Sequence, residues 1–559
     1  MIRRINHKKK TGSTFTPEAL ANFLAKRILY YSDGADGISV LDPACGNGIL
    51  LSSFLNNSSH SNINLIGYDT NALCIDTTQK QLEDGEHKSI CELHNDDFLT
   101  VSPNNIDLFN KKTRYEFADI VIANPPYVRT QILGAERANE LAKDFNISGR
   151  IDLYYPFLMA MTNALKSGGI LGVITSNRYL STKSGADIRK YLRDNYEILE
   201  IIDLGDTKLF DAAVLPAIFI GKKKSIGSSR VQRPKYSSIY ECDPSHRADI
   251  TDAEDIFQIL NGFSSGIFHI NSKYFEYKAG ELKSCSDKSD IWQLSDDKTK
   301  EVYEKIASNT AFKIKDKFKV RVGIKSCADN VFISRNWVKM GIKIEPQLLR
   351  PMLSQENITT WHIDSSNVVD VLYPHYSKGG KRMVYDISEF PEALRYLEHY
   401  KEQLTGRSYV IKANRNWYEY WVPQNPALWD FPKIVFPDIS AWPRFCLDKS
   451  GAIVNGNCYW ICAQSKEEER LLLLIAGVCN SSLMTKYHDS KFPNKLYSGR
   501  RRYLSQYIEE YPIPNPDSSA SKRIIQLVNK IGWINDESKI KCISSEIDSL
   551  VEEAFGLRD

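Results

Sequence analysis

Apolar runs that alternate with helical patterns over residues 38–175 restrict this chain to few folds. Each run is short, rich in Ile, Val or Leu, and bounded by turn residues, as buried strands are. The runs are ISVL (38–41), NLIGY (64–68), ADIVIA (118–123) and GGILGVIT (168–175). A helical pattern at 152–166 precedes the last run, and another spans 16–30 with Thr16 as its N-cap candidate. This alternation predicts a mainly parallel sheet with helices on both faces.

Two further apolar runs, ILEIIDLG (198–205) and VLPAIFIG (214–221), follow each other with no helical pattern between them. Strands joined so directly pair antiparallel, so we expect a hairpin that closes one edge of the sheet. After about residue 285 aromatic and charged residues mix, and the strand patterns become short and irregular. We therefore expect a first domain at 1–285, a second at 286–515 and a helical C-terminal segment at 516–559.

Length and composition agree with a globular protein of more than one domain. The chain has 559 residues, of which 42% are hydrophobic and 25% charged, and its net charge is +3. No apolar run approaches the ~18 residues of a membrane span, and the basic N-terminus lacks the apolar core of a secretory signal. Eleven cysteines and ten histidines show no zinc-binding spacing. These features predict a cytoplasmic protein with reduced thiols, no bound metal and no membrane contact.

A glycine-rich turn in VLDPACGNGILL (40–51) follows the first predicted strand. Gly46 and Gly48 permit a tight turn and a close approach of the backbone to a nucleotide. The turn lacks the Lys-Ser/Thr pair of a phosphate-binding loop and departs from the GxGxxG pattern of dinucleotide sites. Asp69 follows the next strand, where a carboxylate can accept both hydroxyl groups of a ribose.

A third strand ends in NDDFL (95–99), where Asp97 and Phe98 could bond to an adenine ring and cover it. A glycine-rich turn or a single strand-end Asp is often only structural. Because these features follow three successive strands, we interpret them together as a site for an adenosine-containing molecule.

The motifs resemble, in content and order, those of the TaqI-type (gamma class) S-adenosylmethionine-dependent DNA adenine-N6 methyltransferases. In chain order they are TFTPEALANFLA (14–25), LDPACGNG (41–48), Asp69, NDDF (95–98), NPPY (124–127), DLYYPFLMAMTNALKSGGILGVITSNRYL (152–180) and LFDAAVLPAIFI (209–220). The resemblance covers residues 11–225 and departs from the family at Asn47, where Ser is common. It continues more loosely through VRVGIKSCADNVFI (320–333) and KLYSGRRRYLSQYIEEYPIP (495–514), which resemble the family's target-recognition domain.

The resemblance implies an α/β fold, namely a seven-stranded Rossmann-like methyltransferase sheet followed by a mixed α+β target-recognition domain. It also implies a site-specific, adenine-specific DNA methyltransferase that flips its target base out of double-stranded DNA. We expect the modification enzyme of a restriction-modification system, and a cognate restriction endonuclease is its candidate partner. We further expect a bacterial or archaeal enzyme that binds DNA as a monomer in the cytoplasm and is nucleoid-associated when bound.

The family's site residues can be carried over to matching positions of this chain. The predicted S-adenosylmethionine contacts are Thr16, Asp42, Ala44, Cys45, Gly46, Gly48, Asp69, Asp97, Phe98 and Asn124. The predicted catalytic residues are Asn124, Pro125, Pro126, Tyr127 and Phe210.

The NPPY motif has a chemical reason. An adenine amine attacks a methyl group only when it becomes tetrahedral, which two acceptors on its N–H bonds favour. The Asn124 side-chain oxygen and the Pro125 carbonyl can supply them, because the prolines fix the direction of that carbonyl. A base must leave the duplex to reach such a pocket, where Tyr127 and Phe210 are expected to stack on it. Ordinary core packing is the alternative for each ring.

Basic and aromatic residues cluster in KANRNWYEYW (412–421) and KYHDSKFPNKLYSGRRRY (486–503). Such clusters suit contacts to DNA phosphates, although charged runs also occur on ordinary solvated surfaces. The predicted DNA contacts are Arg129, Lys486, Lys491, Lys495, Arg500, Arg501 and Arg502.

Two other functions stay open on the sequence. Protein-glutamine and RNA-guanine methyltransferases also use NPPY-like loops, although those families generally lack a C-terminal half of this size. A catalytically silent DNA-binding specificity subunit of a defence complex is the other alternative. The intact residues Asp42, Gly46, Asp69, Asn124 and Tyr127 argue against such silence.

Overall fold

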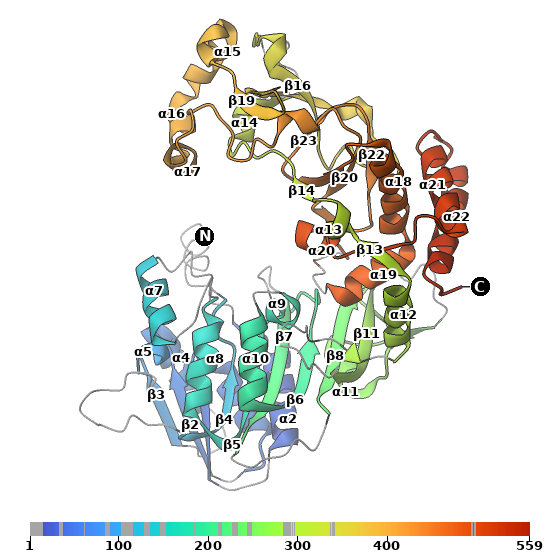
Figure 1. Cartoon of the computed structure of the whole chain (residues 1–559). Helices are drawn as coiled ribbons and strands as arrows, with labels where there is room; N and C mark the ends of the chain where they lie inside the picture. Colours follow the sequence, from blue (N-terminus) through green and yellow to red (C-terminus); the bar gives the residue numbers. More distant parts are fainter. Residues whose placement is uncertain are drawn as a thin grey trace. The chain divides into compact units, whose positions relative to one another are not determined.

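The structure is a computed structural model of the chain (Figure 1). It describes residues 15–32, 37–60, 62–83, 90–101, 116–127, 135–145, 152–182, 185–210, 215–225, 233–242, 249–282, 292, 294–295, 297–335, 337, 341–492, 496 and 499–558. In this part of the chain no helix is both long and apolar enough to cross a membrane.

The chain divides into two compact units. Unit 1 comprises Met1–Asp296 with Leu496–Gly499, and unit 2 comprises Asp297–Lys495 with Arg500–Asp559. The division therefore follows Asp296, later than the expected boundary at 285. The segment expected to be helical, 516–559, contains two helices that bury their apolar faces in the core of unit 2.

Unit 1 is an α/β unit whose elements alternate as the sequence predicts. Its helices are α2 (Glu18–Tyr31), α3 (Ile49–Asn57), α4 (Ala72–Glu83), α5 (Phe98–Val101), α7 (Ala135–Asp144), α8 (Tyr154–Ala164), α9 (Arg178–Ser181), α10 (Ala186–Asn195) and α11 (Ile256–Gly262). Its strands are β1 (Ile38–Asp42), β2 (Ile63–Tyr68), β3 (Ile90–His94), β4 (Ala118–Ala123), β5 (Leu165–Ser176), β6 (Tyr196–Asp203), β7 (Pro216–Lys223), β8 (Lys235–Glu241), β9 (Ile250–Asp252), β10 (Gly266–Ile270), β11 (Lys273–Leu282) and β12 (Leu294–Ser295).

The strands of unit 1 form one sheet in the order β3-β2-β1-β4-β5-β7-β6-β8-β11-β10-β9, with β12 paired to β11. Strands β3 to β5 are parallel, and β7 is antiparallel to both β5 and β6. This confirms the predicted mainly parallel methyltransferase sheet with its antiparallel pair. The pair does not close the edge, however, because β8 adds to β6 in parallel and the sheet continues beyond it. An apolar strand such as β6 is thereby kept from exposing unpaired backbone groups.

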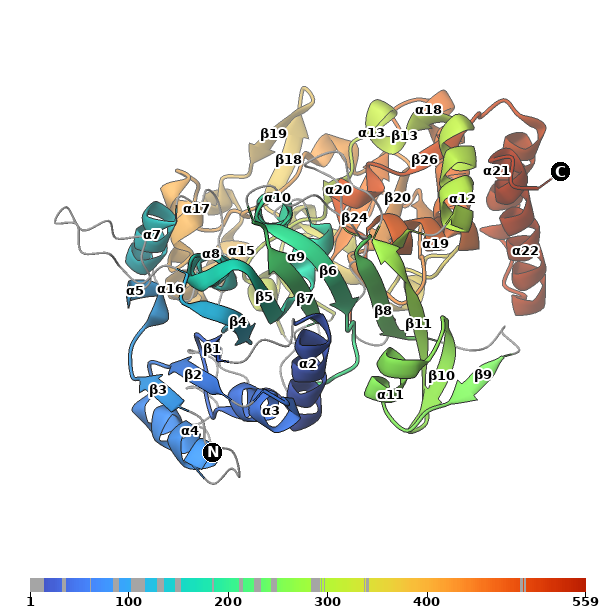
Figure 2. The same cartoon turned by 90° about the horizontal axis from the view of Figure 1, so that it is seen from below.

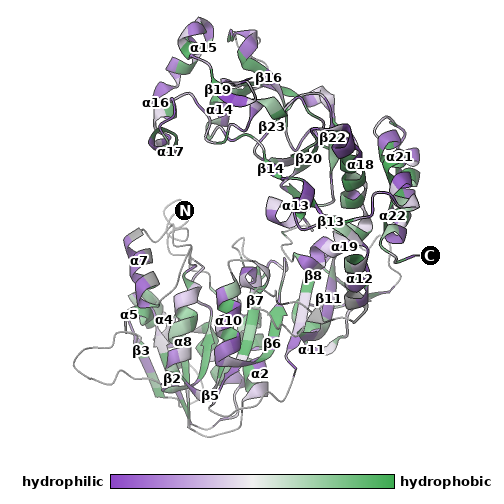
Figure 3. Cartoon of the chain, in the orientation of Figure 1, coloured by the Kyte–Doolittle hydropathy of each residue, from purple (hydrophilic) through white to green (hydrophobic). Residues whose placement is uncertain are grey.

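Helices cover both faces of this sheet (Figure 2). Neighbouring residues of β1 show the alternation: Val40 joins one core cluster and Leu41 the other. Helices α2, α3, α4 and α11 contribute to the first cluster, and α5, α7, α8 and α10 to the second. Strands buried on both faces are mostly apolar, and Figure 3 shows β5, β6 and β7 mostly in green.

Unit 2 is a mixed α+β unit made of short strands and helices. Its helices are α12 (Asp297–Ser308), α13 (Ile314–Lys317), α14 (Asp329–Phe332), α15 (Pro391–His399), α16 (Lys401–Thr405), α17 (Ser408–Lys412), α18 (Lys466–Asn480), α19 (Ser482–Lys491), α20 (Ser505–Ile508), α21 (Ser519–Ile531) and α22 (Glu537–Ala554). Its strands are β13 (Thr310–Lys313), β14 (Arg321–Val322), β15 (Ile333–Ser334), β16 (Leu349–Leu353), β17 (Val369–Leu372), β18 (His375–Lys378), β19 (Lys381–Val384), β20 (Lys433–Pro437), β21 (Ile439–Ser440), β22 (Cys446–Asp448), β23 (Ile453–Val454), β24 (Cys458–Cys462), β25 (Arg501–Arg502) and β26 (Pro512–Pro514).

Two small sheets organise unit 2, in the orders β14-β24-β20-β22 and β15-β17-β16-β23. Two-stranded pairs join β18 to β19, β13 to β26 and β21 to β25. One core cluster gathers α18, α21 and α22, and a second gathers α14, α15 and the strands β16 and β17.

Candidate functional site

The predicted site residues of unit 1 follow the carboxyl ends of β1, β2, β3 and β4. Ligands of open α/β sheets bind at this edge, outside the carboxyl ends of the strands. Asp42 ends β1, Asp69 follows β2, Asp97 lies shortly after β3 and Asn124 follows β4. Because the sheet order is β3-β2-β1-β4, all four side chains follow adjacent strands.

The turn after β1 has the backbone that its glycines predict. Gly46 and Gly48 have φ angles of +55° and +80°, which other residues rarely adopt. A Cβ atom on Gly48 would lie 2.7 Å from the Thr78 side chain, so packing alone requires this glycine. A Cβ atom on Gly46 would meet only the ring of Phe15, at 3.7 Å, among the described residues. Gly46 is therefore the glycine that leaves room for a ligand.

The Asp42 carboxyl is fully buried and only half satisfied. Its Oδ1 accepts a hydrogen bond from the Ala44 amide at 3.1 Å, whereas Oδ2 has no partner among the described residues. Burial raises the pKa of Asp42 to about 8, and the charge of Asp69 adds to the effect. A buried oxygen that accepts no hydrogen bond lowers the stability of the fold unless a ligand donates one to it. The Asp42 Oδ2 atom therefore suits a bound ligand that carries a hydrogen-bond donor. Cys45 of the same turn is buried, and burial raises the pKa of its thiol, which keeps the thiol protonated.

The Asp69 carboxylate is held by two backbone amides. Oδ1 accepts from Asn71 at 2.8 Å and Oδ2 from Gly46 at 3.0 Å. Asn95 donates to the Asp69 carbonyl at 2.9 Å, which links the ends of β2 and β3. Each carboxylate oxygen has a second lone pair, so Asp69 can still accept the two hydroxyls of a ribose. The amide donors and the half-buried position therefore fit the adenosine part of S-adenosylmethionine.

Asp97 and Phe98 already have protein partners. Asp97 accepts from the Leu99 amide at 3.0 Å and forms an ion pair with Arg137 at 2.8 Å. Phe98 is 3% exposed and packs against Tyr68 in the core, with ring centroids 5.2 Å apart. Their contact with an adenine ring stays a prediction. It requires Asp97 to accept a hydrogen bond from the adenine while it remains paired with Arg137.

Asn124 is oriented on both sides of its amide. Its Nδ2 donates to Thr16 Oγ1 at 3.0 Å, and the Tyr127 hydroxyl donates to its Oδ1 at 2.7 Å. The expectation that Thr16 caps α2 was wrong: Pro17 is the N-cap, no side chain caps the helix, and the Thr16 hydroxyl serves Asn124 instead. Pro125 is buried and Pro126 half-buried. The motif thus presents one amide oxygen with a free lone pair from a rigid turn.

Tyr127 and Phe210 are in contact, but edge to face. Their ring centroids are 6.4 Å apart and their planes meet at 71°. A base held between two rings needs them parallel and roughly 7 Å apart, which is two van der Waals separations of about 3.5 Å. Phe210 is 8% exposed and belongs to the core cluster of α2 and α3. The two-ring clamp therefore stays a prediction that requires Phe210 to move. Burial also raises the pKa of Tyr127, which keeps its hydroxyl protonated as a donor.

The predicted DNA contacts separate into two groups. Arg501 donates to both oxygens of Asp489 at 2.6 and 2.8 Å, and Arg502 pairs with Asp438 at 2.5 Å. Their DNA role stays a prediction, since both have structural partners. Lys486, Lys491 and Arg500 are exposed, whereas Arg129 and Lys495 lie outside the described residues.

Sequence reasoning missed three features of this site. Phe15 is 55% exposed beside Gly46, and TFTP carries no signal that would distinguish it from a surface residue. Arg137 was missed because its partner Asp97 lies 40 residues away. The bond between Thr16 and Asn124 was missed for the same reason, with 108 residues between them.

Comparisons with known proteins agree with this geometry. A model of the Eco57I restriction-modification methylase family matches residues 18–210, and a model of the TaqI-like C-terminal specificity domain matches residues 385–513. The chain is 41% identical over 567 residues to the Type II methyltransferase M.BanIII of Aneurinibacillus aneurinilyticus, covering 98% of this chain and 97% of that protein. It is 24% identical over 574 residues to M.BstVI of Geobacillus stearothermophilus, covering 98% and 96%.

Among solved structures, the Type IIL restriction-modification enzyme MmeI in complex with DNA aligns with 97% of this chain and 73% of that chain. The TM-score is 0.60 and the identity 14%, which supports a shared fold. The match to M.BanIII extends over nearly the whole of both chains, at an identity that shows common family membership. The protein therefore belongs to the Type II methyltransferases of restriction-modification systems, which methylate DNA and take the methyl group from S-adenosylmethionine.

Proposed function

We propose that the protein methylates the N6 amino group of an adenine that is flipped out of a specific double-stranded DNA sequence. The observation that carries the proposal is the Asn124 side chain, held by Thr16 and Tyr127 at the carboxyl end of β4. An amide oxygen fixed beside a proline carbonyl suits an exocyclic amine. Methylation of a ring carbon would instead need a covalent nucleophile, and Cys45 of the glycine-rich turn is buried with a protonated thiol.

The residues of the chain can prepare the amine for attack. The Asn124 Oδ1 and the Pro125 carbonyl would each accept one N–H bond, so that the lone pair turns toward the methyl group. The Tyr127 hydroxyl would continue to donate to Asn124 Oδ1, because this bond uses one lone pair of the oxygen and leaves the other for the amine. The bound S-adenosylmethionine supplies a methyl group made electrophilic by its sulfonium. The amine becomes acidic as the new bond forms, so no strong base is needed beforehand.

Asp69 and Asp42 would hold the cofactor in different ways. Asp69 would accept the ribose hydroxyls with the lone pairs that the two backbone amides leave free. Asp42 would direct its unpartnered Oδ2 at a donor of the ligand, and a positive group there would stabilise its ionised form. Gly46 would let the ligand approach the turn between them.

The partners follow from the same proposal. We expect the protein to bind DNA as a monomer and to protect sites that a cognate restriction endonuclease cuts. Light scattering of the complex with one short duplex should give a single protein chain per duplex. A mass of two chains per duplex would contradict the monomer.

The reaction is tested with purified protein, labelled S-adenosylmethionine and duplex DNA. Label should be recovered as N6-methyladenine after digestion to nucleosides. Label only on cytosine, on RNA or on protein would overturn the proposal, and the last two would favour the open alternatives. Sequencing of host DNA after expression of this chain alone would then identify the methylated sequence.

Replacing Asn124 by Ala should reduce the methylation rate by roughly 10²–10³-fold, the usual effect of removing one group that stabilises charge in a transition state. Cofactor and DNA affinity should change little, because the interaction strengthens mainly in the transition state. Tyr127→Phe keeps the ring and releases only the bond to Oδ1, so its loss of rate should be smaller. Single-turnover kinetics with both ligands saturating measure this, and equal losses in the two variants would contradict a direct role of Asn124.

A further inference from the structure

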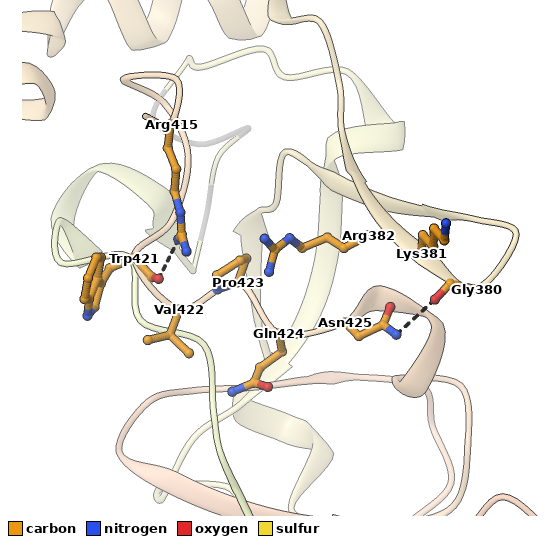
Figure 4. Close-up of a pocket in the computed structure, with 9 residues that line it drawn as sticks. All are labelled: Gly380, Lys381, Arg382, Arg415, Trp421, Val422, Pro423, Gln424 and Asn425. Carbon is orange, nitrogen blue, oxygen red and sulfur yellow. Dashed lines mark hydrogen bonds between the residues drawn. The ribbon is translucent and has the colours of Figure 1, made fainter. Parts of the chain in front are cut away.

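Unit 2 contains an open hollow between the β18–β19 hairpin and the chain segment that follows Arg415 (Figure 4). Its volume is about 490 Å³. Lys381 and Arg382 reach it from β19, and Arg415 and Trp421 from the opposite side. The hairpin lies outside both basic clusters that the sequence singled out, whereas Arg415 and Trp421 lie in the first of them.

The hollow collects positive charge without a counter-ion. Its lining contains no carboxylate, and within the described part of the chain its three cations form no ion pair. Figure 4 shows Arg382 extending above Pro423 toward the end of Arg415, which reaches the Trp421 carbonyl. Arg501 and Arg502, in contrast, are each neutralised by an Asp. Two cations that converge on one space repel each other until an anion lies between them.

Arg415 is held in this position by the backbone. Its Nη1 donates to the Tyr420 carbonyl at 2.5 Å and to the Trp421 carbonyl at 2.6 Å. The guanidinium also lies over the Trp421 ring, 5.6 Å from its centroid. A guanidinium fixed through one nitrogen keeps other N–H bonds for a ligand, so Arg415 is a preorganised donor.

The hairpin is fixed as well. Gly379 and Gly380 form its turn with positive φ angles, and Asn425 donates to the Gly380 carbonyl at 3.1 Å. Within the hairpin, His375 of β18 is 3% exposed, and burial followed by the charges of Arg382 and Arg415 lowers its pKa to about 3. His375 is therefore neutral, and it adds no positive charge to that of the two arginines.

We propose that this hollow binds one backbone phosphate of the DNA that the protein methylates, with Arg382 and Arg415 as its donors. Guanidinium groups match the oxygens of a phosphodiester, and Trp421, 39% exposed, offers an apolar face to the adjoining sugar. The proposal rests on the proposed function, because it takes DNA as the source of the phosphate.

The test compares Arg382→Gln with wild-type protein on a duplex selected by binding from a random-sequence pool. This choice of duplex does not depend on methylation. Loss of one phosphate contact should flatten the plot of log affinity against log salt by a slope of about 0.9. The matched control is Arg523→Gln on α21, which removes the same charge from a residue paired with Glu546 and should leave the slope unchanged. Arg415 donates hydrogen bonds to two backbone carbonyls, whereas Arg382 forms no hydrogen bond among the described contacts. Substitution of Arg382 is therefore the test that disturbs the fold less.

A second readout identifies the phosphate. Single phosphates of the duplex are replaced in turn by neutral methylphosphonates. At one position the replacement should lower the affinity of wild-type protein but not that of Arg382→Gln, which has already lost this contact. An unchanged salt slope, or independent effects at every position, would overturn the inference.

Inorganic phosphate without DNA separates the two sources of the anion. Binding of free phosphate that depends on Arg382, with an unchanged slope on the duplex, would mean a free-anion site and would also overturn the inference. If the slope of log affinity against log salt depends on Arg382 but the protein methylates no adenine, the inference is supported and the proposed function is overturned.

Discussion

Among single residues, Asp42 is a carboxyl group that the fold buries completely. Its pKa is raised from 3.8 to about 8, so between these values the folded protein holds a proton that the unfolded chain has lost. The unfolded state then binds fewer protons than the folded state, and the free energy of unfolding falls as pH rises through this window. The free energy of unfolding of the cofactor-free protein therefore falls toward pH 8. The group responsible is Asp42, which we assign to cofactor binding.

Asp42→Asn should remove this pH dependence while keeping an acceptor for the Ala44 amide. The stability of wild-type protein relative to the variant should fall between pH 5 and 8, by up to about 1.4 kcal/mol per pH unit. Thermal unfolding across this range, without cofactor, measures the difference. The same change at the exposed Asp255 should leave the two profiles parallel, and parallel profiles for Asp42→Asn would show that its carboxyl is ionised throughout.

At the level of elements, strand β25 shows how neighbouring residues of a basic run acquire different tasks. Arg501 is 14% exposed and ties β25 to Asp489 of α19, while Arg500, just before the strand, is exposed. The run GRRR looks uniform in the sequence. Both arginines of β25, which pairs with β21, bind an acid, whereas Arg500 lies outside the strand in solvent.

Arg501→Gln should lower the free energy of unfolding by roughly 1.5–3 kcal/mol, the value of hydrogen bonds to a charged group. Its slope of DNA affinity against salt should stay unchanged, whereas Arg500→Gln should reduce that slope without affecting stability. Denaturant unfolding and salt titrations measure the two effects. Combining Arg501→Gln with Asp489→Asn should cost less than the sum of the single changes, because the two residues interact. Additive costs would show that the pair does not stabilise unit 2.

For the whole molecule, the helices α21 and α22 decide how unit 2 closes its core. Their residues Ile524, Ile531, Ile547, Val551 and Phe555 are at most 1% exposed and join α18 in one cluster. Each such side chain contributes roughly 1.5–3 kcal/mol on burial, so the five together match the whole stability of a typical domain.

A chain that ends at residue 515 should therefore lose the cooperative unfolding of unit 2 and expose apolar surface. Calorimetry and binding of a hydrophobic dye measure both effects. Trp533→Ser is the control, because Trp533 lies between the same helices but is 85% exposed, and its loss should change stability by no more than about 0.5 kcal/mol. Retention of the unit 2 transition by the shortened chain would show that the rest of unit 2 folds without residues 516–559.

Features that depend on neighbours along the chain were determined by the sequence alone. The strands β1 to β7, the glycine turn at Gly46 and the NPPY motif follow from apolar periodicity and from the restricted backbones of glycine and proline. The tertiary structure decided which distant side chains meet: Thr16 with Asn124, Arg502 with Asp438, and Arg382 with Arg415 across one hollow. It also decided that β6 is an inner strand, because β8 pairs with it. Such pairings depend on strand register and packing between separated segments, which no local pattern of residues specifies.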